Sequence, residues 1–171
     1  MTKIVLDMSM SLDGYISGPD GEDRGLYDWY FDPNIDPTSL EVKNEGIATF
    51  KAIVLGKNSY GEGFDETPYD AAHFVLTHEA PKTGTHGAIT FEFVGDLATA
   101  IDKARVAAGD GDVAIGGGAD VAQQRLAAGV VDEIQIHLVP KILGAGKRLF
   151  DGAALDLVPT RIVEASGVTH L

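Results

Sequence analysis

The segment Val113-Ala114-Ile115-Gly116-Gly117-Gly118-Ala119-Asp120-Val121 decides the fold of this chain. Its three apolar residues predict a short buried strand, and residues 119–128 predict a helix that Gly129 ends. Three successive glycines let the backbone approach a ligand closely, and the helix start that follows leaves N–H groups free to bind an anion. A tight strand-to-helix turn is the alternative explanation, although a turn alone does not require three glycines.

Strands and helices alternate on both sides of this turn. Apolar or alternating runs predict strands at 4–10, 51–55, 73–77, 88–94, 113–115, 131–139 and 157–165. Helical spacing and capping residues predict helices from Asp36 or Thr38 to about 50, at 58–62, at 96–107 and at 119–128. We expect 11–33 to be a long loop, because it is rich in glycine, aspartate and proline. The alternation predicts a three-layer α/β fold, with a mostly parallel sheet and helices on both faces, in one domain spanning 1–171.

The composition limits the classes of function. The chain has 171 residues and no cysteine, which excludes disulfides and thiolate metal sites and fits a cytoplasmic enzyme. Its five histidines lack paired metal-ligand spacing, so we expect no metal. No apolar run reaches the roughly 18 residues of a membrane span. A net charge of −13 disfavours nucleic acid and anionic membranes as partners, so a bound anion needs local backbone N–H groups and cations.

Two other strands end in residues that suit the same ligand site. Leu55-Gly56-Lys57-Asn58-Ser59 offers a cation and side-chain donors beside a helix start, and Leu76-Thr77-His78 offers a hydroxyl and an imidazole. A helix cap with a solvated lysine and a surface histidine are the alternative explanations. Because ligands bind at the carboxyl ends of parallel strands, we expect both segments to meet the triple glycine in one crevice.

Two polar residues interrupt predicted strands. Asp7 lies among apolar residues of the first strand, where a carboxylate must be exposed, paired or functional. His137 lies between Ile136 and Leu138, where a structural histidine is the usual explanation. No Gly-x-Ser-x-Gly motif is present, which removes the simplest hydrolase hypothesis.

Several segments agree in order and spacing with one known family. They are Ser11-Leu12-Asp13-Gly14-Tyr15-Ile16, Leu55-Gly56-Lys57-Asn58-Ser59-Tyr60, Phe74-Val75-Leu76-Thr77, Ile115-Gly116-Gly117-Gly118 and Val131-Asp132-Glu133-Ile134. Through them the chain resembles the dihydrofolate reductase-like superfamily over nearly its whole length. Leu143-Gly144-Ala145-Gly146-Lys147-Arg148-Leu149-Phe150 is typical of one branch, that of the C-terminal reductase domain of riboflavin biosynthesis (RibD) and its small stand-alone relatives.

The resemblance implies a sheet of about eight strands, NADPH as hydride donor, and a homodimer with an apolar edge at 131–149. It implies that loop 11–21 covers the nicotinamide and that the Gly116–Gly117 peptide is cis. It places the cofactor against residues from five segments: Ser9, Ile16, Leu55, Gly56, Lys57, Asn58, Ser59, Leu76, Thr77, His78, Ile115, Gly116, Gly117, Gly118, Ala119, Asp120 and Val121.

Two departures from the family bear on the substrate and the cofactor. The acid of folate-reducing enzymes falls near Leu40, and a common arginine is replaced by Ala119, which leaves Lys57 and His78 to favour NADPH over NADH. We therefore expect an NADPH-dependent reductase of a small heterocyclic (pyrimidine- or pterin-like) or carbonyl-bearing substrate. A dihydrofolate reductase and a non-catalytic dinucleotide-binding homodimer are the alternatives. On the substrate side we expect Asp7 and His137 as catalytic residues, with contacts from the aromatic residues Trp29, Tyr30 and Phe31.

Overall fold

The computed structural model describes residues 1–60, 67–79, 83–86, 89–152 and 154–171. Within these ranges a nine-stranded sheet has the order β10-β11-β8-β1-β7-β3-β4-β6-β5. Its strands are β1 (Ile4–Ser11), β3 (Phe50–Gly56), β4 (Ala72–Leu76), β5 (Thr83–His86), β6 (Ile89–Val94), β7 (Asp112–Ile115), β8 (Glu133–Val139), β10 (Val163–Ala165) and β11 (Val168–His170). A separate small sheet pairs β2 (Tyr15–Ser17) with β9 (Lys147–Arg148).

The middle of the large sheet is parallel. β1 pairs in parallel with β7 and β8, and β3, β4 and β6 extend the parallel part. The antiparallel strands β5, β10 and β11 lie at its two edges. The carboxyl ends of β1, β3, β4 and β7 therefore meet at one end of the sheet. The predicted mostly parallel α/β fold is confirmed, with nine strands where about eight were expected.

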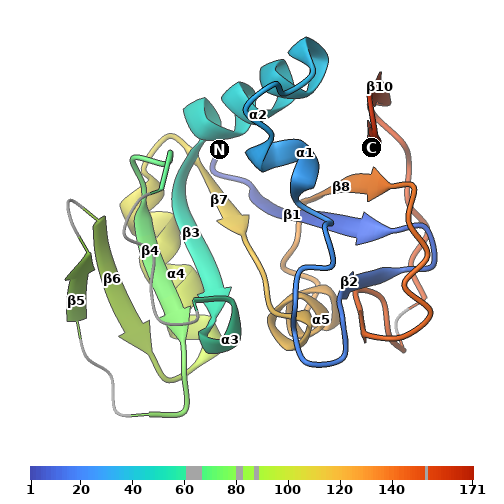
Figure 1. Cartoon of the computed structure of the whole chain (residues 1–171). Helices are drawn as coiled ribbons and strands as arrows, with labels where there is room; N and C mark the ends of the chain where they lie inside the picture. The colour runs from blue at the N-terminus through green and yellow to red at the C-terminus, as the bar shows by residue number, and fades with distance from the viewer. Residues whose placement is uncertain (61–66, 80–82, 87–88, 153) are drawn as a thin grey trace.

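Helices cover both faces of the sheet (Figure 1). α4 (Leu97–Ala108) and α5 (Ala119–Ala127) share one buried cluster with Ile4, Leu6 and Met8 of β1. α1 (Asp28–Phe31) and α2 (Pro37–Thr49) lie over the other face, and the short α3 (Lys57–Tyr60) directly follows β3. None of the helices in the described ranges is long and apolar enough to cross a bilayer. The side chains of Ile4, Leu6 and Met8 thus point from β1 into this core, and Asp7 lies on the other face of the strand.

Some element boundaries differ from the expectations. The segment 11–33 contains β2 and α1 and is therefore not a continuous loop, and 157–165 forms a strand only from Val163. β5, β9 and β11 were not predicted. These strands have two to four residues, too few for a visible alternation, and their backbone partners lie elsewhere in the chain. We expected an apolar sheet edge at 131–149. This expectation is wrong for β8, the strand in that range, because β8 pairs with β1 on one side and with β11 on the other.

The loop after β1 is hydrogen-bonded to the segment 143–150. The Asp13 carboxylate accepts hydrogen bonds from Ser11 Oγ (2.6 Å), Gly144 N (2.8 Å) and Leu143 N (3.1 Å). The Ser11 hydrogen bond, followed by those from the two backbone N–H groups, lowers the pKa of Asp13 to about 2. Gly146 has a φ of +148°, and a Cβ there would overlap the carbonyl oxygen of Ser17. Both motifs therefore position the loop that leads from β1 to β2.

Candidate active site

The triple glycine docks directly on the end of β3. The Gly116 N–H donates to the Val54 carbonyl (2.9 Å), and the Gly56 N–H donates to the Gly117 carbonyl (3.2 Å). A Cβ on Gly56 would lie 3.1 Å from Val121 Cγ2, and one on Gly117 would lie 2.8 Å from Ser59 Oγ. We call Gly56, Ser59 and Gly116–Gly118 the glycine junction. A Cβ at Gly56 or Gly117 would crowd the side chain of Val121 or Ser59, so both positions favour glycine.

The conformation of the turn leaves N–H groups available. Gly117 and Gly118 have φ values of +133° and +83°, which side chains disfavour. Gly118 is the N-cap of α5, and no side chain hydrogen-bonds to that end of the helix. The first-turn N–H groups therefore have no intrahelical partner and suit an anion. The expected cis peptide is wrong, because every described peptide bond is trans, and the positive φ angles form the turn instead.

The third junction, after β4, lies next to the first two. Gly56 pairs with Leu76, so Thr77 follows directly beside the glycine junction. Thr77 is buried, and its Oγ1 accepts a hydrogen bond from Glu79 N (3.1 Å). His78 is exposed, and Lys57 is paired with Glu79. The sequence therefore identified three segments that do meet, although the expected cation is already in an ion pair.

The remaining predicted cofactor residues fall into two groups. Leu55, Ile115, Ile16 and Ala119 are buried in the core, so a ligand can reach only their backbone atoms. Asn58 and Asp120 are exposed at the starts of α3 and α5.

Asp7 and His137 form a direct contact on the face opposite the main core. The register of β1 with β8 sets Ser9 beside His137, and His137 Nε2 lies 2.6 Å from Asp7 Oδ1. The Asp7 side chain is 19% exposed. Trp29 stacks against His137 with ring centroids 4.7 Å apart and donates from Nε1 to Ser9 Oγ (3.0 Å). The structure thus brings both predicted catalytic residues together with Trp29.

Tyrosines surround the Asp7 carboxylate. Burial, followed by the negative charge of Asp7, raises the pKa of Tyr27 to about 12. Burial also raises the pKa of Tyr30 and Tyr69, whose hydroxyls lie 3.4 Å apart. All three phenols therefore keep their protons at neutral pH. Phe31 is 74% exposed, and its ring contacts that of Tyr30 with centroids 5.1 Å apart.

Hydrogen bonds continue from His137 into two residues that the sequence reasoning missed. His137 Nδ1 lies 2.7 Å from His170 Nδ1, and His170 Nε2 lies 3.1 Å from Ser39 Oγ. Burial and the neighbouring His137 lower the pKa of His170 to about 4. We call Asp7, His137, His170 and Ser39 the acid–histidine chain. Nothing local signals it, because its members lie on β1, β8, β11 and α2.

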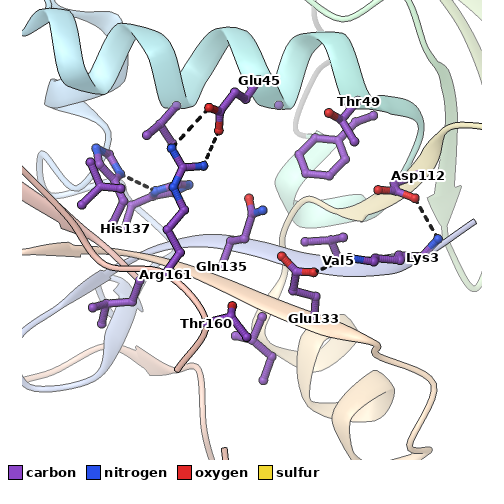
Figure 2. A pocket seen from close by; sticks show the side chains of 17 residues that line it. Lys3, Val5, Glu45, Thr49, Asp112, Glu133, Gln135, His137, Thr160 and Arg161 are labelled. Atoms are coloured by element: carbon purple, nitrogen blue, oxygen red, sulfur yellow. Dashed lines mark hydrogen bonds and ion pairs between the residues drawn. The ribbon is translucent and has the colours of Figure 1, made fainter. Parts of the chain in front are cut away.

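A pocket of about 260 Å³ opens beneath α2 on this same face. His137 lies at one end and Lys3 at the other (Figure 2). His170 also lines the pocket and hydrogen-bonds to His137. Arg161 crosses it and binds both carboxylate oxygens of Glu45 on α2, while Lys3 pairs with Glu133. The pocket therefore reaches the acid–histidine chain from the side away from the glycine junction.

Comparison with known proteins identifies the family. The family model of the RibD C-terminal domain matches residues 65–169, more than half of the chain. The chain belongs to the RibD C-terminal domain family. A putative riboflavin biosynthesis protein from Shewanella sp. PV-4 is 25% identical, with a TM-score of 0.66 and coverage of 99% of this chain and 96% of that one.

More distant structures place this RibD C-terminal domain within the dihydrofolate reductase-like fold. A dihydrofolate reductase from Enterococcus faecalis complexed with NADP(H) is 16% identical, with a TM-score of 0.60 and coverage of 98% and 92%. A diaminohydroxyphosphoribosylaminopyrimidine deaminase/5-amino-6-(5-phosphoribosylamino)uracil reductase from Thermotoga maritima is 17% identical, with a TM-score of 0.61. This chain is 99% covered and spans 55% of that bifunctional protein. The chain thus shares the dihydrofolate reductase-like fold.

The sequence reasoning set Leu40 of α2 near the position of the acid of folate-reducing enzymes. Leu40 of this RibD C-terminal domain is 39% exposed. Nearby Asp36 caps α2, its carboxylate accepting from Thr38 N (2.9 Å) and Ser39 N (3.4 Å). Ser39 itself is buried and contacts His170. In the acid–histidine chain the acidic group is Asp7 of β1, and α2 contributes Ser39.

Proposed function

We propose that this chain is an NADPH-dependent reductase of a small heterocyclic or carbonyl-bearing substrate. One observation carries the proposal. Leu6 of β1 pairs with Ile115 of β7, so the next residues along the two strands are Asp7 and Gly116. The contact between Asp7 and His137 therefore lies next to the glycine junction, close enough for a bound cofactor and its substrate to reach both.

The residues of the glycine junction fit a dinucleotide. A Cβ on Gly117 would crowd Ser59 at a φ of +133°, which favours glycine there, and the start of α5 would offer its N–H groups to a pyrophosphate. We propose that Lys57 and His78 favour the extra phosphate of NADPH over NADH, since the net charge of −13 leaves few cations to do so. When bound, NADPH supplies the hydride.

The chain's own residues would handle the proton and the substrate's position. The Asp7–His137 pair holds a proton beside the reacting face, where a hydride acceptor needs one. Trp29 and Tyr30 form an apolar wall suited to a flat ring, and their packing excludes water. A dihydrofolate substrate is disfavoured because Leu40 offers no acid on α2.

The test starts with cofactor binding. NADPH and NADH are titrated against the protein by fluorescence, with tighter binding expected for NADPH. Oxidation of the reduced cofactor is then followed with dihydrofolate and with the ribosylaminopyrimidine of riboflavin biosynthesis as acceptors. Reduction of the pyrimidine in preference to dihydrofolate is the expected result. Failure to bind either dinucleotide would overturn the proposal, and binding without turnover of a broad set of pyrimidines, pterins and carbonyl compounds would favour a non-catalytic binding protein.

A further inference from the structure

We propose that His170, oriented by Ser39, relays protons to the Asp7–His137 pair from water in the pocket beneath α2. This inference rests on the proposed reductase function and extends it to two residues outside the reacting groups. Each turnover of a hydride acceptor that is also protonated consumes one proton, so a buried acid needs a path for its replacement.

The geometry forms an unbroken row of hydrogen-bonding atoms. The successive distances are 2.6 Å from Asp7 Oδ1 to His137 Nε2, 2.7 Å from His137 Nδ1 to His170 Nδ1, and 3.1 Å from His170 Nε2 to Ser39 Oγ. Each imidazole thus uses both of its nitrogens within the row. The two rings face each other through their Nδ1 atoms, so a proton can pass from one imidazole to the other.

Both protonation states of the pair satisfy every atom of the row. With His137 neutral, Ser39 donates to His170 Nε2, His170 Nδ1–H donates to His137 Nδ1, and His137 Nε2–H donates to Asp7. With His137 protonated, His137 Nδ1–H donates to His170 Nδ1 and His170 Nε2–H donates to Ser39 Oγ. Changing between these states moves one proton inward and leaves no buried group without a partner.

The proton balance of the relay is simple. The His137 Nε2–H proton passes to Asp7 and on to the substrate as the His170 Nδ1–H proton passes to His137 Nδ1, and His170 takes a replacement at Nε2 from water in the pocket that it lines. Both imidazoles are then left in the opposite tautomer, so each ring turns back before the next proton passes. One proton enters at the pocket for each proton consumed, and no electron passes along the row.

The electrostatic surroundings favour passage of the proton over storage at His170. Burial and His137 keep His170 neutral, and Arg161 adds to this effect, while Asp7 and Asp36 oppose it. On the other side of Asp7, Tyr27, Tyr30 and Tyr69 keep their protons because their pKa values are raised. Among the side chains facing Asp7, imidazole is therefore the type that ordinarily exchanges protons near neutral pH.

Solvent reaches the row at His170 through the pocket, whereas Ser39 is buried and does not line it. His170 is only 5% exposed, yet it lines this cavity of about 260 Å³ together with His137. The cavity approaches from beneath α2, whereas the glycine junction lies at the carboxyl ends of β3 and β7. Protons would therefore enter without passing through the space that the dinucleotide and the substrate fill.

Kinetics on His170→Phe test the relay. Phenylalanine keeps the ring contact with Trp29 but cannot carry a proton. We expect kcat to fall about tenfold or more above pH 7, to approach wild type at low pH, and to recover with added imidazole, while NADPH affinity stays within twofold. Ser39→Ala should show a smaller loss with the same pH dependence. His73→Phe is the matched control, because His73 is equally buried and bonds only to the Ala71 carbonyl among the described residues.

A pH-independent loss with no response to imidazole would overturn the relay and leave His170 with a packing role. A second measurement does not depend on turnover: ¹⁵N NMR of the imidazoles in wild type and in Asp7→Asn. The relay predicts that Asp7→Asn changes the tautomer populations of His170, although the two side chains do not touch. Unchanged His170 resonances would contradict it, even in a protein that reduces no tested acceptor. Absence of dinucleotide binding would instead overturn the proposed function alone.

Discussion

The glycine junction and the acid–histidine chain are built in opposite ways. The first consists of backbone atoms held by bonds between neighbouring strands, such as Gly116 N to the Val54 carbonyl. The second consists of side chains from β1, β8, β11 and α2. In two of its three contacts the paired residues are more than a hundred positions apart in the sequence. A site made of backbone atoms suits a cofactor that many enzymes share, whereas a row of interacting side chains determines the chemistry of one reaction.

This difference predicts separable defects. Damage to the glycine junction should remove cofactor binding, and damage to the acid–histidine chain should remove turnover while the cofactor still binds. Asp7→Asn, Gly117→Ala and Lys57→Gln test that separation, and Asp13→Asn tests the loop that follows β1. The variants are ordered from the largest expected effect to the smallest.

Asp7→Asn should lower kcat by about 10²–10⁴-fold, the usual contribution of a positioned acid or base, because the amide cannot donate a proton to the substrate. NADPH affinity should stay within about twofold of wild type, measured by fluorescence titration. Asp112→Asn is the control, since the Asp112 carboxylate accepts from Lys3 N at the amino end of the strands. A parallel loss of NADPH affinity in Asp7→Asn would show that the two regions do not separate.

Gly117→Ala should weaken NADPH binding on the order of 100-fold, because the added Cβ displaces the backbone of the glycine junction and misaligns the ligand. The added Cβ would lie 2.8 Å from Ser59 Oγ at a φ of +133°. Gly109→Ala controls for backbone strain, since Gly109 also has a positive φ (+58°) but no atom within 4 Å of its Cβ position. Equal losses of affinity in both variants would point to general destabilisation, which thermal unfolding would reveal.

Lys57→Gln should weaken NADPH binding about tenfold and leave NADH binding nearly unchanged, because one charge-assisted contact to a phosphate is lost. The effect should shrink at high salt, since Lys57 is exposed. Lys103→Gln is the matched control, as it removes another exposed lysine paired with a glutamate, Glu92. Equal losses for NADPH and NADH would argue against a role in selecting between them.

Asp13→Asn should lower the melting temperature by a pH-dependent amount. The folded pKa of Asp13 is lowered to about 2, so its ionised form stabilises the fold at pH values above the unfolded pKa of about 4. That stabilisation is lost as the pH falls from about 4 to 2, and the two melting temperatures should converge there. Scanning calorimetry from pH 7 to pH 2 measures the gap, and a gap that stays constant over this range would contradict the account.

The sequence predicted the glycine junction well because its signal is local. A strand, three glycines and a helix are adjacent in the chain, and parallel strands bring their carboxyl ends together by geometry alone. The same reasoning failed for β9 and β11, which have two and three residues and depend on distant partners for their hydrogen bonds.

The acid–histidine chain was predicted only at its inner end. Asp7 and His137 were visible as polar residues inside apolar strands, and the register of β1 with β8 joins them. His170 lies three residues after a turn at Gly167, in a strand too short for a pattern, and Ser39 resembles any polar residue in the first turn of a helix. Their roles depend on side-chain orientation, which no sequence period encodes.

A crystal structure with bound NADP⁺ tests the central claim most directly. The account predicts the pyrophosphate on the N–H groups at the start of α5, and the nicotinamide beside Ser9 on the face of the sheet that carries Asp7. A dinucleotide bound away from the glycine junction, or a nicotinamide on the opposite face of the sheet from Asp7, would contradict it.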